Sequence, residues 1–536
     1  MRSLRFYSIL IILGLISINI FNCSSKGENK TSFTKTAKDS VLYLRLPANP
    51  PTLNPVISTD VYSGEIISLV FDGLISVDSN FNIIPQVAKR WEIKDSGKVI
   101  KFILRNDVYF HDGVKLTAKD VKFTYNKIMD PHVRAENKRA DFKDVDTVIV
   151  VDDTTLIVKY KKVYAPALLS WGFSILPKHI YSKGDFNTIE ANSKPIGSGP
   201  YKFVSWETNQ RVRLIRNENY WGLKPKIKYI TFKIIIENNA ALNAFKRGDI
   251  YIYGFADPFK WKNFIKDPSV KNRFYFLEYY TMGFSYIGWN LRRNLFKDKN
   301  VRKALTFALN REEIAKSIYL NKAKVCTGPF YFKSWAYDTT IKPYKFSLDS
   351  AKYYLKKAGW KDNNGDGILD KNGKKFEFTI LMTSGSENAE KILTIYKENL
   401  KKIGIVMNIQ MLEWATLLDR VHKRDFDAVI LGWALGIDPD IYMLFHSSQV
   451  DHGLNYVGYK NVVVDSLLEK AQHTFDINER KKMYHKVHRI LHEEQPYTFL
   501  FYRASLVGVN KKLKNVHASP MGITGYYPSI LEWELE

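Results

Sequence analysis

Hydrophobic periodicity changes along this chain of 536 residues, and that change limits it to a mixed fold. In the first half, β-branched and aromatic runs bounded by turn residues predict strands at 41–46, 99–104, 147–151, 155–160 and 229–236. In the second half, apolar residues recur every three or four positions, which predicts helices at 301–319, 348–358, 387–403, 415–423, 463–474 and 478–494. Early strands followed by helices interleaved with strands predict an α/β protein with more than one lobe.

Composition excludes several other classes of protein. With 45% hydrophobic and 14% aromatic residues, the chain is too apolar for intrinsic disorder. Its two cysteines, Cys23 and Cys326, allow no disulfide framework. After residue 22, no segment has the roughly 20 consecutive apolar residues of a membrane-spanning helix. We therefore expect a soluble body of about three structural units, stabilised by packing.

The first 22 residues predict an export signal. Two arginines precede an apolar run at 7–20, which has the length of a signal-peptide core. The sequence Ile20-Phe21-Asn22-Cys23 resembles a bacterial lipobox, in which the strict pattern has Gly or Ala at the position of Asn22. A lipidated Cys23 would anchor the protein to a bacterial membrane, and residues 23–40 would form a flexible tether. The alternative is a secreted protein that is cleaved nearby.

The net charge of +25 raises the question of a nucleic-acid or lipid partner. The lysines are dispersed along the chain, and pairs such as Lys401-Lys402 lie on ordinary amphipathic stretches. We therefore interpret the charge as a solvated surface and expect no nucleic-acid partner.

Motifs of enzyme chemistry are absent from the sequence. There is no Gly-x-x-x-x-Gly-Lys-Ser/Thr loop, no His-Glu-x-x-His and no Gly-x-Ser-x-Gly. The loop Gly197-Ser198-Gly199-Pro200 is rich in glycine, but Pro200 removes a backbone donor that a phosphate would need. His485, His488 and His492 share a helix face, which is more typical of packing than of a metal site. We expect no catalytic residues, no cofactor and no metal.

One loop has the oxygen spacing of a calcium site. Its candidate ligands are Asp362, Asn364, Asp366 and Asp370. The twelfth position is Gly373, where a bidentate Glu would complete the site. The alternative is a turn that leads into a strand at 376–381, because Asn-Gly and Asp-Gly are strong turn formers.

A series of short segments together resembles one known family. In order, they are Leu53-Asn54-Pro55, Phe71-Asp72-Gly73-Leu74, Ala88-Lys89-Arg90-Trp91-Glu92, Phe102-Ile103-Leu104-Arg105, Phe110-His111-Asp112-Gly113, Leu116-Thr117-Ala118-Lys119-Asp120-Val121, Gly197-Ser198-Gly199-Pro200-Tyr201, Arg216-Asn217-Glu218-Asn219-Tyr220-Trp221, Val301-Arg302-Lys303-Ala304-Leu305, Phe426-Asp427 and Asp438-Pro439-Asp440. The chain resembles the extracellular solute-binding proteins of family 5, which serve ABC importers of peptides, nickel and related solutes. The resemblance runs almost from end to end.

This resemblance implies an α/β, two-lobe clamp of the periplasmic-binding-protein type, with an extra subdomain and a hinge of two chain crossings. The implied boundaries are 1–22 for a lipoprotein signal peptide, 23–40 for the tether, 41–75 plus 196–282 plus 505–536 for lobe I, 76–195 for the extra subdomain and 283–504 for lobe II. Such a clamp closes over a solute and delivers it to an ABC permease driven by separate ATPase subunits. We expect an exported monomer at the periplasmic or cell-surface face of a bacterial membrane.

The resemblance also implies a set of ligand-binding residues. The turn Thr59-Asp60-Val61-Tyr62 resembles a stretch whose backbone pairs with an extended peptide as an added strand. An ordinary strand-to-helix loop is the alternative. Residues of lobe II are candidates for side-chain pockets, although each could equally belong to a core. These candidates are Tyr286, Trp289, Asn290, Trp414, Trp433 and, near the return crossing, Tyr502.

One departure from the family pattern affects the expected solute. Many peptide-binding relatives have an Asp three residues after the equivalent of Trp433, where it pairs with the ligand's α-amino group. This chain has Gly436 there. Asp438 and Asp440 lie close by, and the resemblance implies that they cap a loop. Because a buried ammonium without a carboxylate is costly, we expect a longer peptide with a solvated terminus, a blocked peptide or another solute.

Two further functions remain as alternatives. A surface lipoprotein could serve adhesion or peptide-signal capture, and neighbouring genes for permeases and ATPases would argue against that function. An exported enzyme would need a nucleophile, a base or a metal site, and the sequence offers none of these in a recognisable arrangement.

Overall fold

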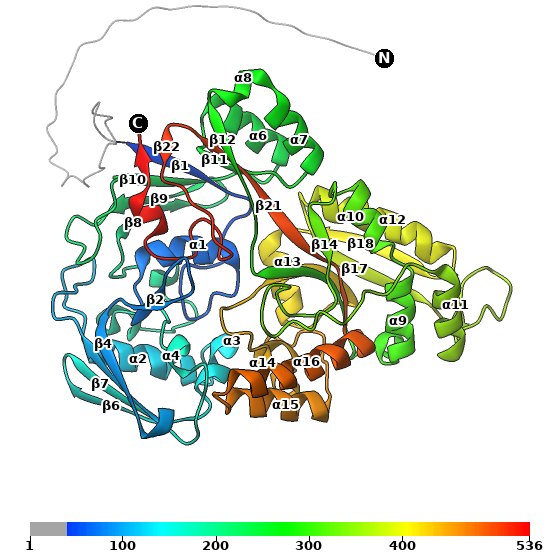
Figure 1. Ribbon diagram of the computed structural model, residues 1–536, viewed down its shortest axis with the longest axis horizontal. Helices are drawn as coiled ribbons and strands as arrows, with labels where there is room; N and C mark the ends of the chain where they lie inside the picture. The colour runs from blue at the N-terminus through cyan, green and yellow to red at the C-terminus, as the bar shows by residue number, and fades with distance from the viewer. Residues whose placement is uncertain (1–39) are drawn as a thin grey trace, which may run out of the picture. The chain divides into compact units, whose positions relative to one another are not determined.

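The computed structural model describes residues 40–536, so the predicted signal sequence, Cys23 and the tether up to residue 39 lie outside the described residues. Four sheets of four or five strands, with helices packed on them, form the described chain (Figure 1). Three short ladders complete it: β2 (Ile75–Val77) with β3 (Ile83–Pro85), β15 (Asp370–Lys371) with β16 (Lys374–Lys375), and β22 (Leu513–Lys514) with β23 (Glu534–Leu535). No helix among these residues is long and apolar enough to cross a membrane.

The first sheet contains the N-terminal strand. Its order is β1 (Val41–Leu46), β10 (Tyr229–Ile234), β9 (Arg211–Arg216) and β8 (Tyr201–Glu207). In β1, Leu42, Leu44 and Leu46 are buried and their neighbours are partly exposed, as the alternation of side chains along a strand requires. Helix α1 (Val61–Val70) packs against β8.

The second sheet belongs to the predicted extra subdomain and is antiparallel throughout. Its order is β4 (Ala88–Lys94), β5 (Val99–Leu104), β7 (Thr155–Tyr160) and β6 (Val145–Asp152). The predicted strands 147–151 and 155–160 lie in β6 and β7, which are joined by a hairpin turn after Asp152, where Asp152 pairs with Thr155. The helices of this part are α2 (Ala118–Met129), α3 (Glu136–Arg139), α4 (Ala167–Ser170) and α5 (Lys178–Tyr181).

The third sheet joins the two halves of the chain. Strand β21 (Phe501–Asn510) pairs with β14 (Ala323–Val325) through its first residues and with β12 (Phe274–Tyr280) and β11 (Ile252–Gly254) through the rest. Helices α6 (Asn238–Arg247), α7 (Pro258–Lys266) and α8 (Pro268–Lys271) lie beside it (Figure 1). The chain crosses between the lobes after β12 and again along β21, which gives the hinge of two crossings.

The fourth sheet lies in the second lobe. Its order is β18 (Val406–Leu412), β17 (Glu377–Thr383), β19 (Ala428–Ala434), β13 (Gly283–Trp289) and β20 (Tyr497–Phe499). The helices of this lobe are α9 (Lys299–Phe307), α10 (Arg311–Ser317), α11 (Leu348–Lys357), α12 (Glu387–Lys401), α13 (Trp414–His422), α14 (Tyr442–Phe445), α15 (Val462–Gln472) and α16 (Ile477–Glu494).

The predicted strands and helices are present, with one correction. The stretch 301–319 was expected as a single helix, but it forms α9 and α10 with a break at 308–310. The side chain of Asn310 accepts a hydrogen bond from the backbone N–H of Glu313 at 3.1 Å and so caps a new helix. Such a cap favours the start of a new helix after Asn310. The apolar periodicity of 301–319 therefore runs through two separate helices.

The hydrophobic cores of the described chain can be compared with the predicted domains. One core combines residues of 42–234 with residues of 507–533, so lobe I and the extra subdomain are packed together. Another lies within 287–501. The residue boundaries of the lobes stay a prediction, but this shared core means that the extra subdomain is packed on lobe I as one body.

Candidate functional site

The N-terminus of α1 brings the predicted turn 59–62 against the second lobe. Asp60 caps the helix, because its Oδ1 accepts hydrogen bonds from the backbone N–H groups of Tyr62 and Ser63, both at 3.0 Å. Burial raises the pKa of Asp60, and the backbone N–H groups of Ser63 and Tyr62 partly offset that rise. The second carboxylate oxygen of Asp60, Oδ2, is buried without a hydrogen-bond partner in the described chain, and so is Nε1 of Trp414 on the other lobe.

Two contacts join this turn to α13 of lobe II. The rings of Tyr62 and Trp414 meet edge to face, with centroids 5.6 Å apart and an interplanar angle of 66°. Thr59 Oγ1 lies 3.4 Å from His422 Nε2. Burial lowers the pKa of His422 to about 4, so its imidazole is neutral near pH 7. Residues more than 350 positions apart thus form one surface, on which the lobes touch.

Glu65 is a cleft residue that the sequence reasoning missed. Its side chain is exposed on α1, one turn after Val61, which is 52% exposed. No hydrogen bond or ion pair involves its carboxylate within residues 40–536. Desolvation by the surrounding protein and, to a smaller extent, the negative charge of Asp60 together raise its pKa to about 7. A Cβ at Gly64 would meet nothing within 4 Å, so this helix face is open. Val61 and Glu65 are four residues apart, so they share one face of a helix, and this spacing is the sequence signal that would have identified Glu65.

An aromatic stack forms the wall of the second lobe. Tyr286 stacks on Tyr497 with ring centroids 4.0 Å apart and on Trp433 with centroids 6.1 Å apart. Trp433 continues the stack onto Tyr456 at 5.6 Å, and its Nε1 donates to the hydroxyl of Tyr497 at 3.4 Å. Trp433 is partly exposed, whereas the three tyrosines are buried behind it. The predicted Tyr286 therefore supports Trp433 from behind.

The position that departs from the family pattern is open. Gly436 is exposed, and a Cβ built there would meet Asp438 O at 3.6 Å, which is ordinary contact. Asp438 accepts hydrogen bonds from Arg480 Nη2 through both carboxylate oxygens, at 2.6 and 2.8 Å. Asp438 also caps the backbone N–H of Asp440. Its carboxylate is thus engaged by the protein, and its role as a ligand contact stays a prediction.

Three other candidates lie inside the protein. Trp289 is buried and donates from Nε1 to Thr498 Oγ1 at 3.2 Å. Asn290 is buried, and its Nδ2 donates to two backbone carbonyls of 424–426. Tyr502 is buried, and its hydroxyl donates to the carbonyl of Gly328. Because their polar groups are already bonded within the protein, we leave these three out of the site proposed below.

The calcium-type loop is a turn. Asp362 accepts from the backbone N–H groups of Gly365 at 2.7 Å and Gly367 at 2.9 Å. Asp366 pairs with Lys375 Nζ at 2.6 Å. No group of three or more His, Cys, Asp or Glu residues in the described part of the chain is arranged to hold a metal ion. The weak calcium candidate set of Asp362, Asn364, Asp366 and Asp370 stays a prediction, and in the structure these side chains stabilise the turn before β15–β17.

Several family segments converge on one buried carboxylate. Asp72, which is 1% exposed, accepts hydrogen bonds from Ser198, Tyr220, Trp221 and Gln86 at 2.9–3.1 Å. Burial raises its pKa to about 6, although these four donors act to lower it. The segments around these residues are therefore tied together as scaffold at a distance from the cleft surface.

A hinge of two crossings between two α/β lobes, whose facing surfaces meet at α1 and α13, defines a clamp-type binding protein. The model of the bacterial extracellular solute-binding proteins, family 5 (middle part), matches residues 82–452, and the chain belongs to this family. The oligopeptide-binding protein AppA of Bacillus subtilis is 34% identical over 530 residues, covering 95% of this chain and 96% of AppA.

Solved structures agree with this assignment. The structure of AppA from Bacillus subtilis in complex with a nonapeptide matches with a TM-score of 0.88 at 34% identity, covering 93% of this chain and 99% of that one. NikZ from Campylobacter jejuni in complex with Ni(L-His) matches with a TM-score of 0.82 at 30% identity, covering 92% of this chain and 99% of that one. The predicted periplasmic-binding-protein-like, two-lobe fold is therefore confirmed.

Proposed function

We propose that this protein is the solute-binding component of an ABC importer and that it captures oligopeptides between its two lobes. The observation that carries the proposal is the pair of facing surfaces: the open face of α1 on one lobe, and Trp433 with its tyrosine stack on the other. Similarity to an oligopeptide-binding protein over almost the whole chain supports peptides as the solute.

Binding would use the backbone of the turn 59–62 and the aromatic wall in different ways. Backbone groups beside α1 would pair with an extended peptide main chain, which gives affinity independent of side chains. Trp433, which is partly exposed, would contact a peptide side chain with the part of its indole that the stack leaves uncovered. Closure would then seat Tyr62 against Trp414, so the interlobe contact belongs to the closed form of the clamp.

The open position at Gly436 favours peptides whose amino terminus stays in water. An Asp side chain would fit there, but the chain places none, and the carboxylate of Asp438 is engaged by Arg480. A long or blocked peptide that extends past Gly436 leaves no buried ammonium to neutralise. NikZ, which was solved with Ni(L-His), makes a small metal chelate the second candidate solute, although the described residues include no metal-binding group.

Export and anchoring extend the proposal beyond the described residues. We infer that cleavage before Cys23 leaves a lipidated N-terminus and that residues 23–40 tether the body to a bacterial membrane. A monomer would then deliver its solute to permease subunits, and separate ATPase subunits would supply the energy. Mass spectrometry of the membrane fraction tests this part, because it predicts an N-terminal peptide that begins with acylated Cys23.

Native mass spectrometry of the protein purified from rich medium tests the peptide proposal. We expect a ladder of co-purified peptides, identified after denaturation, with lengths above the dipeptide range. Protein that has been unfolded, freed of solute and refolded serves as the matched control, and it should take up the same ladder from a peptide mixture. One defined non-peptide species would overturn the peptide proposal within the same family. A protein that stays empty in both preparations would contradict the importer role.

A further inference from the structure

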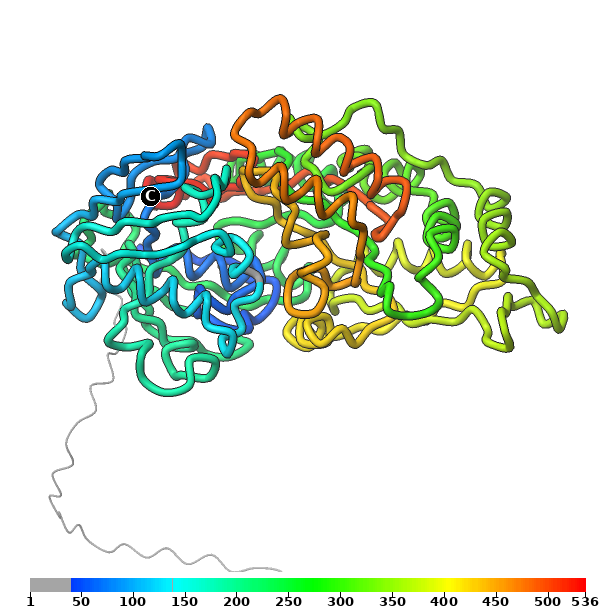
Figure 2. Tube along the Cα trace, turned by 90° about the horizontal axis from the view of Figure 1, so that it is seen from below, coloured from blue at the N-terminus to red at the C-terminus, as the bar shows by residue number. Residues whose placement is uncertain are grey.

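The extra subdomain and lobe II meet at a second contact, away from α1. It joins residues 138–165 to residues 438–484, and we call it the subdomain–lobe contact; both segments can be followed in Figure 2. The backbone N–H of Ala165 donates to the carbonyl of Gln472 at 2.7 Å. Because the extra subdomain shares its core with lobe I, this contact connects the two halves of the clamp.

Lys143 and Asp144 of the extra subdomain each contact an aromatic side chain of lobe II. Lys143 Nζ lies 3.4 Å from the centroid of the Tyr442 ring, and Asp144 Oδ2 lies 2.8 Å from His473 Nε2. These two contacts join the extra subdomain to lobe II directly.

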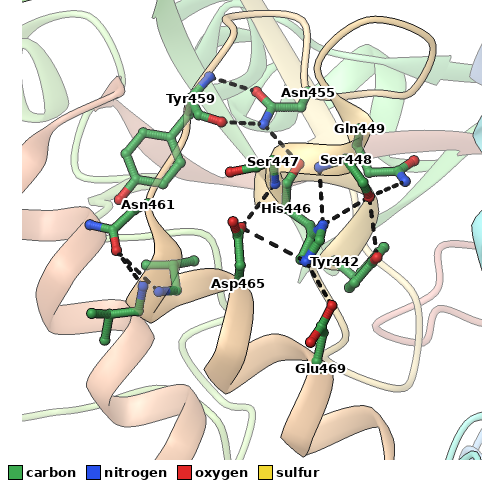
Figure 3. Close-up of polar contacts among 12 residues, drawn as sticks. Tyr442, His446, Ser447, Ser448, Gln449, Asn455, Tyr459, Asn461, Asp465 and Glu469 are labelled. Carbon is green, nitrogen blue, oxygen red and sulfur yellow. Dashed lines mark hydrogen bonds and ion pairs between the residues drawn. The ribbon is translucent and has the colours of Figure 1, made fainter.

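The ring of Tyr442 is fixed from within lobe II. It stacks on His446 with centroids 4.0 Å apart and an interplanar angle of 16° (Figure 3). His446 Nε2 lies 3.3 Å from Glu469 Oε1 and 3.9 Å from Asp465 Oδ1, while its Nδ1 contacts Ser448 Oγ at 2.8 Å. Burial lowers the pKa of His446, in spite of these two acids. Lys143 thus lies over a ring that stacking and the hydrogen bond of its hydroxyl with Ser448 hold in place.

One partly buried carboxylate lies on each side of the same contact, Asp141 next to Tyr164 and Asp440 next to Gln472. Asp440 of lobe II accepts from Gln472 Nε2 at 2.6 Å and from the backbone N–H of Tyr442 at 2.9 Å. Asp141 of the extra subdomain accepts a long hydrogen bond from the Tyr164 hydroxyl at 3.5 Å. Burial raises the pKa of Asp141 to about 7 and of Asp440 to about 6, and the charge of Asp440 adds to the rise at Asp141.

Two ammonium groups reduce this repulsion without cancelling it. The charges of Lys138 and Lys143 act to lower the pKa of Asp141, and Lys143 also acts to lower that of Asp440, yet both pKa values stay raised. Arg480 is held by Asp438, whose own charge raises the pKa of Asp440 further. The remaining titratable groups that face the pair are the buried hydroxyls of Tyr164 and Tyr484. No arginine or lysine forms an ion pair with Asp141 or Asp440 within residues 40–536.

We propose that the subdomain–lobe contact is an acid-strengthened clasp, in which protonation of the Asp141–Asp440 pair draws residues 138–165 and 438–484 together and holds the clamp closed. When both carboxyls are ionised, two like charges oppose each other across the contact. One proton removes one of these two charges and so relieves the repulsion. Closing takes up protons, so acidification favours the closed form.

Hydrogen exchange at the Ala165 amide tests the clasp without any solute, because this N–H crosses the contact. For the full-length wild-type protein, we expect about tenfold greater protection at pH 5.5 than at pH 7.5, after correction for intrinsic exchange. A carboxyl whose pKa differs by about one unit between the open and the closed form would give this factor. Equal protection at the two pH values would overturn the proposal.

Variants separate the carboxylate pair from other effects of pH. Asp141→Asn mimics the neutral acid, and we expect its Ala165 amide at pH 7.5 to be protected nearly as well as that of the wild type at pH 5.5. Asp440→Asn gives a second, independent version of the same test. Asp146→Asn is the matched control, because Asp146 is exposed on the same segment and should behave like the wild type. If neither pair variant gains protection at pH 7.5, the clasp does not act through these carboxyls.

Discussion

The contact between Tyr62 and Trp414 should set part of the affinity for the solute, since it joins the two lobes directly. An edge-to-face ring pair such as this one, with centroids 5.6 Å apart, contributes about 0.5–1.5 kcal/mol beyond its buried area. Trp414→Ala also removes the rest of the partly buried indole from the interlobe contact. We expect a total loss of about 1–2 kcal/mol from the closed form, which corresponds to a roughly 5- to 30-fold higher Kd.

A double-mutant cycle isolates this ring pair from other effects. Calorimetry with a peptide taken from the co-purified ladder would compare the wild type, Tyr62→Ala, Trp414→Ala and the double variant. We expect the two single losses to exceed the loss in the double variant by about 0.5–1.5 kcal/mol. Tyr353→Ala, an exposed tyrosine on α11, is the control and should bind like the wild type. Losses that add within about 0.3 kcal/mol would refute the reasoning, because independent residues behave in that way.

Three other predictions concern single carboxylates. Gly436→Asp fits the open position, and we expect calorimetry to give about tenfold tighter binding of peptides with a free amino terminus than of their acetylated forms; equal affinities would contradict this. Glu65→Gln should weaken binding of peptides that carry a positive charge several-fold and leave neutral ones unchanged, whereas a uniform loss would indicate a structural effect. Asp72→Ala strands four buried donors, so urea unfolding should give a loss of about 3 kcal/mol or more. Because the folded pKa of Asp72 is raised to about 6 from an ordinary 3.8, its wild-type contribution should be complete below about pH 4 and decline as pH rises through 6, and Asp72→Asn should flatten this slope.

Local patterns predicted the elements of this fold well because they depend on local physics. The run 99–104 became β5 with its predicted bounds, and 387–403 became α12. The break between α9 and α10 was missed because both helices continue one apolar periodicity, and the cap at Asn310 is a single side-chain hydrogen bond. A capping residue in the middle of a long periodic stretch is the signal that would have revealed it.

The candidate site was harder to predict than the fold, although strand periodicity separates two of its predicted residues. Tyr286 and Trp289 both lie on β13 and are three positions apart, so their side chains must point to opposite faces of the sheet. Tyr286 joins the aromatic stack behind Trp433, whereas Trp289 enters the core with Phe296. Tyr456 could not have been found in this way, because only the tertiary fold brings it to Trp433.

The glycines of the family segments and the glycines of the candidate site differ in the space around them. A Cβ at Gly197 would lie 2.0 Å from Val70 O, and one at Gly199 would lie 2.6 Å from Leu69 O, so neither glycine can change without moving α1. At Gly64 and Gly436 the same added atom meets no close neighbour. Substitutions at these two positions should therefore change the stability of the fold little, and the same fold can carry different binding surfaces. For this reason the solute has to be argued from α1 and Gly436, and the family segments alone do not determine it.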